Sequence, residues 1–409
     1  MPDSIHDVLI IGAGPAGLIC AAEAAARGLS VLIVEGQDLP GAKFCMAGMG
    51  AGAVSNDKLS IEAFQGKFAR FASDALAAFD AESLHQWFDA RGLKLAKAPY
   101  YGLVTSPEGG PAIMQALVDA AESAGTELLT GVRVTHLKRT GQGFRASAHG
   151  RTFDARHAVL ATGGQNYPQL GGGEEGSRMA ANFGHTVAPA LPGQVGLRVE
   201  EGWVRELPAL WMDVKASLQQ GRRVLAESVG SMLFTQSGLV GEAIYNVSHA
   251  AEPALQQGEV ELAINFFPEQ PTEEVAQWLF RVLGERTRER VADALDLIVP
   301  RALGRVFLSH QRTKGNERVM QLDERQRDGL LREMIDTRLK VTGTLGLIAA
   351  ESATGGVAVR DVDPRTMQSR KCPGLFVIGE LLDLHAPWGG FRQHFALATG
   401  YLCGRSIAQ

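Results

Sequence analysis

The chain has 409 residues, enough for two or three domains of average size. Its 40 Lys and Arg residues against 45 Asp and Glu residues leave a formal charge of −5, so charge gives no case for nucleic acid or an anionic membrane as the main partner. The 48 Gly residues come without any Gly/Ser-rich or Pro-rich tract, which indicates tight turns and backbone–ligand contacts rather than disorder.

Cysteine usage and the N-terminus point to a reducing compartment. The four cysteines form no C-x-x-C pair and the ten histidines show no ligand spacing, so we expect no metal site. The N-terminus lacks the basic region of a secretory signal, and the most apolar stretch, 8–22, is short and broken by Gly and Pro. We expect a cytoplasmic protein with no membrane partner, and the sequence leaves its oligomeric state open.

The first 35 residues predict one complete βαβ unit. Asp7–Ile11 is a short apolar run rich in β-branched residues, typical of a buried parallel strand. It meets G-A-G-P-A-G at 12–17, followed by an Ala-rich helix over Leu18–Arg27 and a second strand over Val31–Val34. Glu35 ends that second strand, where a dinucleotide-binding unit carries its ribose-binding acid.

The glycine loop has a physical reason at each glycine. Gly12 allows the tight turn, Gly14 lets the backbone approach a pyrophosphate, and Gly17 lets helix and strand pack closely. The helix N-terminus offers free N–H donors to the phosphates. The unit can hold NAD or FAD; the turn ending in Lys43, together with a second dinucleotide-type element near the C-terminus, favours FAD.

The rest of the chain changes pattern in an ordered way. Apolar residues at three-to-four spacing predict a helix over Ile61–Arg91, and Pro111–Ala124 predicts another. Short, turn-punctuated strands fill 191–265, and a charged helical region with arginines interleaved among acids fills 272–338. Strand and glycine patterns then return, with a last apolar strand at Leu375–Ile378.

Motifs spread over nearly the whole chain resemble one family. They are I-I-G-A-G-P-A-G-L near the N-terminus, A-T-G-G-x-x-Y-P at 161–168, L-F-T-x-x-G-L-x-G-x-A-I at 233–244, T-G-G-V with D-P-R-T-M-Q-S within 354–369, and G-E-L-L-D followed by G-G-F. Their order and spacing are similar to those of the bacterial flavoproteins called BaiN-like or YhiN-like, also named after aminoacetone oxidase.

The resemblance implies an α/β fold with a discontinuous Rossmann-like FAD-binding domain. We expect that domain at 1–190 and 345–409, an inserted β-barrel-like domain at 191–270 and 339–350, and a helical insert at 271–338. The pattern changes along the chain follow the same order.

The resemblance also implies the residues that hold non-covalent FAD. The implied contacts are Gly12, Ala13, Gly14, Pro15, Ala16, Gly17, Glu35, Gly36, Lys43, Ala47, Gly48, Val134, Ala161, Thr162, Gly163, Gly379, Glu380, Gly389, Gly390 and Phe391. Glu380 is expected at the ribityl chain, and Gly389 to Phe391 at the isoalloxazine ring. The chain departs from the family pattern in its glycine turn at 49–56, at 171–176, and in the Phe391-Arg392 pair.

Flavin supplies the redox chemistry, so the protein has to orient the substrate and tune the ring. Near the expected flavin end, Arg392 can bind a substrate carboxylate or stabilise anionic flavin, and His385 can move a proton near neutral pH. A packing or surface role stays open for both.

Three functions stay open at this point. The first is an FAD-dependent oxidoreductase that transfers a hydride between a small organic substrate and flavin. NAD(P)H would then bind only transiently as reductant, because no second G-x-G-x-x-G follows a strand. The second is an amine-type oxidase that produces peroxide. The third is a non-enzymatic flavin-binding sensor or scaffold whose Arg-rich helical region contacts a partner or nucleic acid.

Overall fold

The computed structural model describes residues 5–46, 48, 50–64, 69–99 and 101–408. The chain forms two compact units, one from Met1–Pro192 with Leu347–Gln409, the other from Gly193–Gly346. The first unit therefore combines both ends of the chain. The helical region lies within the second unit, and a separate third domain there remains a prediction.

The first unit is built on a mainly parallel sheet in the order β6-β2-β1-β9-β8-β7, with β18 also pairing β9. The strands are β1 His6–Ile11, β2 Val31–Val34, β6 Glu127–Leu129, β7 His136–Thr140, β8 Gly143–Ala148, β9 Arg151–Leu160 and β18 Leu375–Val377. Strand β2 is buried throughout, as is β1 from Val8 onward, which explains their continuous apolar runs. The predicted βαβ unit is present.

Strand β9 joins the two chain ends in one sheet. Its first half pairs antiparallel with β8, and Ala158 to Leu160 pair parallel with β18. On its other side β9 pairs parallel with β1. The carboxyl ends of β1, β9 and β18 consequently meet at one edge of the sheet, where ligands of such folds bind.

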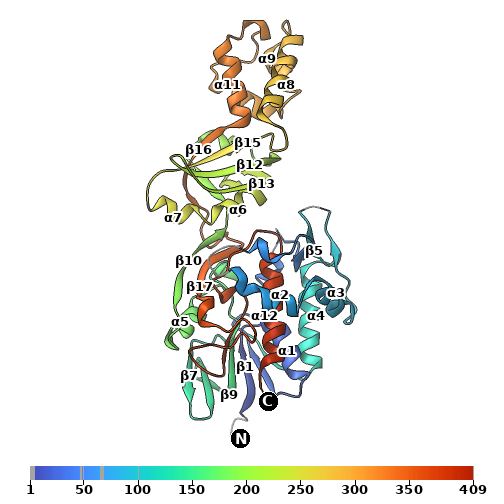
Figure 1. Cartoon of the computed structure of the whole chain (residues 1–409), viewed down its shortest axis with the longest axis vertical. Coiled ribbons are helices and arrows are strands. Elements are labelled where there is room, and N and C mark those ends of the chain that lie inside the picture. Colours follow the sequence, from blue (N-terminus) through green and yellow to red (C-terminus); the bar gives the residue numbers. More distant parts are fainter. Residues whose placement is uncertain (1–4, 47, 49, 65–68, 100, 409) are drawn as a thin grey trace. The chain divides into compact units, whose positions relative to one another are not determined.

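Helices α1 (Pro15–Ala25) and α12 (Phe391–Ser406) pack closely against each other, and Figure 1 draws them in blue and red near the sheet. A Cβ on Gly400 would lie 2.2 Å from the Ala16 carbonyl oxygen, and one on Gly404 would lie 2.5 Å from that of Cys20. Because the two backbones approach this closely, the C-terminal helix is held directly against α1, which begins within the glycine loop.

The predicted long helix over Ile61–Arg91 is wrong. The structure has short pieces instead, including α2 (Ala72–Ala78) and α3 (Ala81–Asp89). The break lies at Phe79, which leaves helical geometry, and at Asp80, whose carboxylate accepts the Ser83 N–H at 2.8 Å as an N-cap. The apolar spacing continues across the break because both helices bury one face against the same unit.

The remaining elements of the first unit cover the sheet or extend its edges. They are β3 Ser55–Asn56, β4 Ala96–Lys97, β5 Leu103–Thr105, α4 Gly110–Ser123, α5 Glu175–Asn182, β10 Val187–Gln194 and β17 Ser352–Val357. Strands β3, β5 and β4 form a small antiparallel sheet, and β10 pairs with β17.

The second unit is a closed barrel with helices attached. The barrel runs β11-β14-β13-β12-β15-β16 and closes between β16 and β11. Its strands are β11 Leu197–Val199, β12 Trp211–Gln220, β13 Arg223–Thr235, β14 Gly238–Val240, β15 Val260–Asn265 and β16 Thr337–Thr344. Helices α6 Glu242–Ser248 and α7 Ala251–Leu255 are followed by α8 Thr272–Glu285, α9 Val291–Leu295, α10 Arg301–His310 and α11 Glu324–Ile335, and Figure 1 shows α8, α9 and α11 grouped together.

The sequence led us to expect no membrane partner and no metal site, and the structure bears on these two expectations only through the residues it describes. Across those residues, no helix is both long enough and apolar enough to cross a bilayer. The same residues bring together no group of three or more His, Cys, Asp or Glu side chains that could hold a metal ion.

Candidate functional site

In the glycine loop between β1 and α1, packing within the protein requires glycine at two positions and does not require it at a third. Gly12 has φ +108°, and a Cβ there would lie 2.4 Å from the Ala161 carbonyl oxygen. A Cβ on Gly17 would lie 2.1 Å from the Gly12 carbonyl oxygen, so strand and helix could not pack. A Cβ on Gly14 would meet no protein atom within 4 Å. Packing therefore explains Gly12 and Gly17 but not Gly14, where the predicted pyrophosphate contact stays a prediction.

Hydrogen bonds from backbone N–H groups hold the Glu35 carboxylate in place. Its two carboxylate oxygens accept the backbone N–H groups of Ala13 at 2.7 Å and Gln37 at 2.8 Å. A carboxylate oxygen has two lone pairs, so each retains acceptor capacity for a ligand hydroxyl. Glu35 lines the site cavity, and its position is compatible with the predicted ribose contact.

One cavity collects most of the residues that the sequence suggested. Those lining it are Gly12, Gly14, Pro15, Ala16, Glu35, Lys43, Ala161, Thr162, Gly163, Gly379, Glu380 and Arg392. Gly36 and Val134 line an adjoining pocket that shares Gly12, Glu35 and Thr162 with it, where an adenine would lie. The loop residues therefore lie around one continuous space next to the carboxyl ends of β1, β9 and β18.

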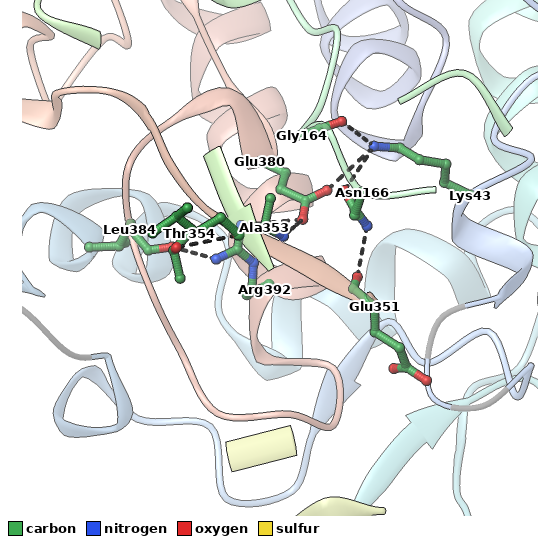
Figure 2. Close-up of polar contacts among 10 residues, drawn as sticks. Lys43, Gly164, Asn166, Glu351, Ala353, Thr354, Glu380, Leu384 and Arg392 are labelled. Atoms are coloured by element: carbon green, nitrogen blue, oxygen red, sulfur yellow. Dashed lines mark hydrogen bonds and ion pairs between the residues drawn. The ribbon is translucent and has the colours of Figure 1, made fainter. Parts of the chain in front are cut away.

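Two cations of the cavity lining flank the Glu380 carboxylate, as Figure 2 shows. The Arg392 guanidinium lies 3.3 Å from Glu380 Oε1 and donates to the Leu384 carbonyl at 2.8 Å. The Lys43 ammonium donates to the Gly164 carbonyl at 2.7 Å and lies 3.7 Å from Glu380 Oε2. Arg392 is thus engaged by the protein, which favours a positioning role over the predicted substrate contact.

The charge on Lys43 is tuned by its surroundings. Burial lowers the pKa of Lys43, the Glu380 carboxylate offsets part of that shift, and the positive charge of Arg392 adds to it. The side chain still makes the contacts of an ammonium, including one to Asn166 Oδ1 at 3.2 Å. Lys43 and Arg392 are the two cations of the cavity lining, and Glu380 pairs with both of them.

Sequence reasoning missed Glu351 and Asn166, which also line the cavity, and the side chains that contact or surround them. Glu351 lines it, and its carboxylate accepts the Gly48 N–H at 3.3 Å and the indole N–H of Trp388. Asn166 Nδ2 donates to the Glu351 carbonyl at 2.9 Å. Burial and the charges of Glu351 and Glu380 raise the pKa of Tyr167 to about 12, so its phenol stays protonated. Asn166 and Tyr167 lie inside the A-T-G-G-x-x-Y-P motif, and that motif was the available signal.

Contacts within the protein explain why glycines stand at the C-terminal pair, Gly389 and Gly390. A Cβ on Gly390, which has φ +97°, would lie 2.2 Å from the Ser55 carbonyl oxygen, and Asn56 Nδ2 donates to the Gly389 carbonyl at 2.8 Å. Gly390 is also the N-cap of α12. The pair lets α12 start against β3, and its contact with the isoalloxazine ring remains a prediction.

His394, one turn further along α12, is a structural histidine. Its Nε2 lies 2.8 Å from the Phe79 carbonyl, which can only accept, so Nε2 carries the proton and Nδ1 accepts from the Ser55 hydroxyl at 2.8 Å. Burial lowers the pKa of His394 to about 4. It is therefore neutral at physiological pH.

The other predicted residues lie outside the cavity lining. Ala13 and Gly17 face the loop interior, and Gly48 binds Glu351 through its backbone. His385 is half-buried and Phe391 is buried at the start of α12. None of these lines the two pockets described above, and Ala47 lies outside the described residues. A catalytic role for His385 remains a prediction.

Taken together, the residues fit a dinucleotide cofactor. The open space at Gly14, the N-terminus of α1 and the acceptor at Glu35 match a pyrophosphate followed by a ribose. Lys43, Glu380 and Arg392 line the same cavity as Gly14 and Glu35.

The family model described as HI0933-like protein Rossmann domain matches residues 6–406. The chain belongs to this family. Two relatives each align over 98% of both chains: a 3-dehydro-bile acid delta(4,6)-reductase from Clostridium scindens is 30% identical over 404 residues, and a ribosomal RNA dihydrouridine synthase from Escherichia coli K12 is 28% identical over 403 residues. Among solved structures, a 3-ketosteroid-delta4-(5alpha)-dehydrogenase from Rhodococcus jostii RHA1 is 18% identical, covering 100% of this chain and 98% of that chain with a TM-score of 0.49.

Family membership confirms the predicted resemblance and the predicted fold, a Rossmann-like α/β domain with an inserted barrel and helices. It also confirms the coarse functional assignment: the chain is an enzyme of the FAD-dependent oxidoreductase type. The individual cofactor contacts remain predictions.

Proposed function

We propose that this enzyme reduces a carbon–carbon double bond conjugated to a carbonyl group. The observation that carries this proposal is the full-length similarity to two relatives whose names describe one reaction type. A 3-dehydro bile acid with double bonds at positions 4 and 6 is a conjugated dienone, and a dihydrouridine synthase saturates the C5–C6 bond of uracil next to its C4 carbonyl. In both, a hydride adds to the carbon distant from the carbonyl and a proton adds to the nearer one.

FAD, when bound and reduced, supplies the hydride. The chain's own residues would bind and orient it: the N–H groups at the α1 N-terminus would hold the pyrophosphate, and Glu35 would accept hydrogen bonds from the ribose hydroxyls. Lys43 and Arg392, the two cations of the cavity lining, would stabilise the negative charge that the reduced cofactor and the enolate formed from the substrate carry.

NAD(P)H is the proposed source of electrons. It would bind transiently, because the chain has no second glycine fingerprint for a nicotinamide domain. The cytoplasmic location expected from the sequence suits such a reductant and is likewise a proposal.

The test begins with an anaerobic titration of the FAD-loaded enzyme with NADH and then NADPH. The reduced enzyme is then mixed with candidate substrates: a panel of conjugated enones that includes a 3-oxo-4-ene steroid, and, separately, uridine. We expect bleaching of flavin absorbance by one nicotinamide and its return on adding an unsaturated carbonyl compound. If air alone restores the oxidised spectrum with formation of peroxide, while an amine reduces the flavin and no enone oxidises it, the oxidase alternative replaces this proposal. Absence of any FAD binding would leave the sensor alternative without support as well.

A further inference from the structure

Asn166 is a buried amide in the wall of the cavity described above. The residue is 2% exposed, and it lines the cavity together with Lys43 and Glu351. Its Oδ1 accepts a hydrogen bond from the Lys43 ammonium at 3.2 Å, and its Nδ2 donates to the Glu351 carbonyl at 2.9 Å, as Figure 2 shows. An ammonium can only donate and a carbonyl can only accept, so these two partners fix which way the amide faces.

The Lys43 ammonium keeps one N–H group for a ligand. An ammonium has three N–H donors. One donates to the Gly164 carbonyl at 2.7 Å and another to Asn166, whereas Glu380 Oε2, at 3.7 Å, lies beyond hydrogen-bonding distance. Lys43 makes no further hydrogen bond among the residues that the structure describes. Since Lys43 lines the cavity, its third N–H can serve a ligand there.

The backbone leaves room for the ammonium, and Asn166 fixes it there. Gly163 has φ +72°, and a Cβ at this position would lie 3.2 Å from Lys43 Nζ. The lysine stem is flexible and loses rotamer freedom when its ammonium is held at one place. Asn166 and the Gly164 carbonyl restrict the stem beforehand, which lowers the entropic cost of binding a ligand. Gly164 contributes only its backbone, so a substitution at Asn166 is the direct way to remove one of these two bonds.

A neutral amide suits this place better than a carboxylate. Burial lowers the pKa of Lys43, the Glu380 carboxylate opposes this shift, and the charge of Arg392 adds to it. A hydrogen-bond acceptor beside the ammonium favours its charged form. Asn166 supplies that acceptor without a negative charge, which would repel an anionic ligand. The arrangement therefore favours a charged Lys43 that can bind an anion.

We propose that Asn166 positions the Lys43 ammonium to bind an anionic group of FAD. FAD has two such groups: the pyrophosphate, which is anionic in both redox states, and the flavin ring, which becomes anionic when it is reduced. Either would accept the third N–H of Lys43 in a charge-assisted hydrogen bond. The proposal rests on the function proposed above, because it requires FAD in this cavity, and it gives a role to a residue at a variable place of the A-T-G-G-x-x-Y-P motif.

The experiment is a double-mutant cycle on the full-length protein with Asn166→Leu, Lys43→Met and the two changes combined. Apo protein is titrated with oxidised FAD by fluorescence quenching, and the midpoint potential of each FAD-loaded protein is measured by spectroelectrochemistry. Gln169→Leu is the matched control, because this exposed amide donates to the Ile348 carbonyl at 3.0 Å and does not line the cavity. Circular dichroism checks that each variant folds, and Asn166→Ala replaces Asn166→Leu if leucine does not fit.

We expect Asn166→Leu to weaken FAD binding about tenfold, the size of one hydrogen bond to a charged group. If Lys43 binds the pyrophosphate, the dissociation constant of oxidised FAD rises by that factor and the midpoint potential stays unchanged. If Lys43 binds the ring, the dissociation constant of oxidised FAD stays unchanged. The potential of the two-electron couple then falls by about 30 mV, which is equivalent to tenfold weaker binding of the reduced form.

In either case the double variant should match Lys43→Met within about twofold, because Asn166 acts through Lys43 and the two effects do not add. Gln169→Leu should match wild type in both measurements. Losses that add in the double variant, or an Asn166→Leu protein with unchanged dissociation constant and potential, overturn the positioning role alone. A wild-type protein that binds no FAD overturns the proposed function as well.

Discussion

The two glycines at the start of the phosphate loop should respond in opposite ways to the addition of one methyl group. Gly14→Ala places its Cβ where no protein atom lies within 4 Å, and Gly14 has φ −77°, which alanine adopts readily. Replacing a glycine N-cap by alanine should lower the free energy of unfolding by less than about 1 kcal/mol. The same methyl group occupies the space that a pyrophosphate needs. We expect FAD affinity to fall at least tenfold, or about 1.4 kcal/mol.

Gly12→Ala is the matched comparison. At φ +108° alanine stores about 1–3 kcal/mol of backbone strain, and its Cβ would also lie 2.4 Å from the Ala161 carbonyl oxygen. For a unit of this size each kcal/mol lowers Tm by about 2–4 °C. We therefore expect the apo form of Gly12→Ala to melt several degrees below wild type, while apo Gly14→Ala melts within a degree or two of it.

The assays are thermal unfolding of the apo proteins by circular dichroism and FAD titration by quenching of flavin fluorescence. If Gly14→Ala binds FAD as tightly as wild type, the pyrophosphate does not lie at the α1 N-terminus and the site assignment fails. If Gly12→Ala keeps the wild-type Tm, the reasoning from its Cβ contact is wrong.

Three further predictions follow. Glu35→Ala should weaken FAD binding by about 1.5–3 kcal/mol, since hydrogen bonds to a charged group are lost; Kd measured by isothermal titration checks it, and an unchanged Kd rules out the ribose contact. Burial lowers the pKa of His394 to about 4 from its ordinary value of 6.5, so as pH falls the imidazole is protonated in the unfolded chain before it is protonated in the folded protein. The resulting stability is complete above pH 6.5 and is lost toward pH 4, about 2 kcal/mol of it by pH 5; urea unfolding at pH 7.5 and 5 should show this, and His394→Gln should flatten the dependence. Glu380→Gln should destabilise the protein by about 3 kcal/mol because it leaves the buried Arg392 guanidinium without its carboxylate, and an unchanged urea midpoint would contradict the role given to that pair.

Local sequence was sufficient for the parts of this protein that depend on short-range rules. The strand over 31–34 was predicted with the bounds it has, and the glycine loop was placed between strand and helix, because β-branched runs, glycines and an acid at a strand end act within a few residues of each other. The sequence pattern alone also predicted the order of the regions: an α/β region, a β-rich region, a helical region and then a second α/β region. The family motifs located most of the residues that line the cavity.

Tertiary contacts decided the rest. The break at Phe79 and Asp80 was hidden because both helices bury the same apolar face, and the need for glycine at 390 comes from Ser55, more than three hundred residues away. Glu351 reaches the cavity because β17 follows the barrel back into the first unit, which no local signal reveals.

The charge distribution is likewise determined partly by the sequence and partly by the tertiary structure. The net charge of −5 and the interleaved arginines predicted a solvated surface with no nucleic-acid partner, and composition supports nothing more. Only the folded chain brings Lys43, Glu380 and Arg392 together in one cavity. Electrostatic potential depends on distances in space, and the sequence alone does not contain those distances.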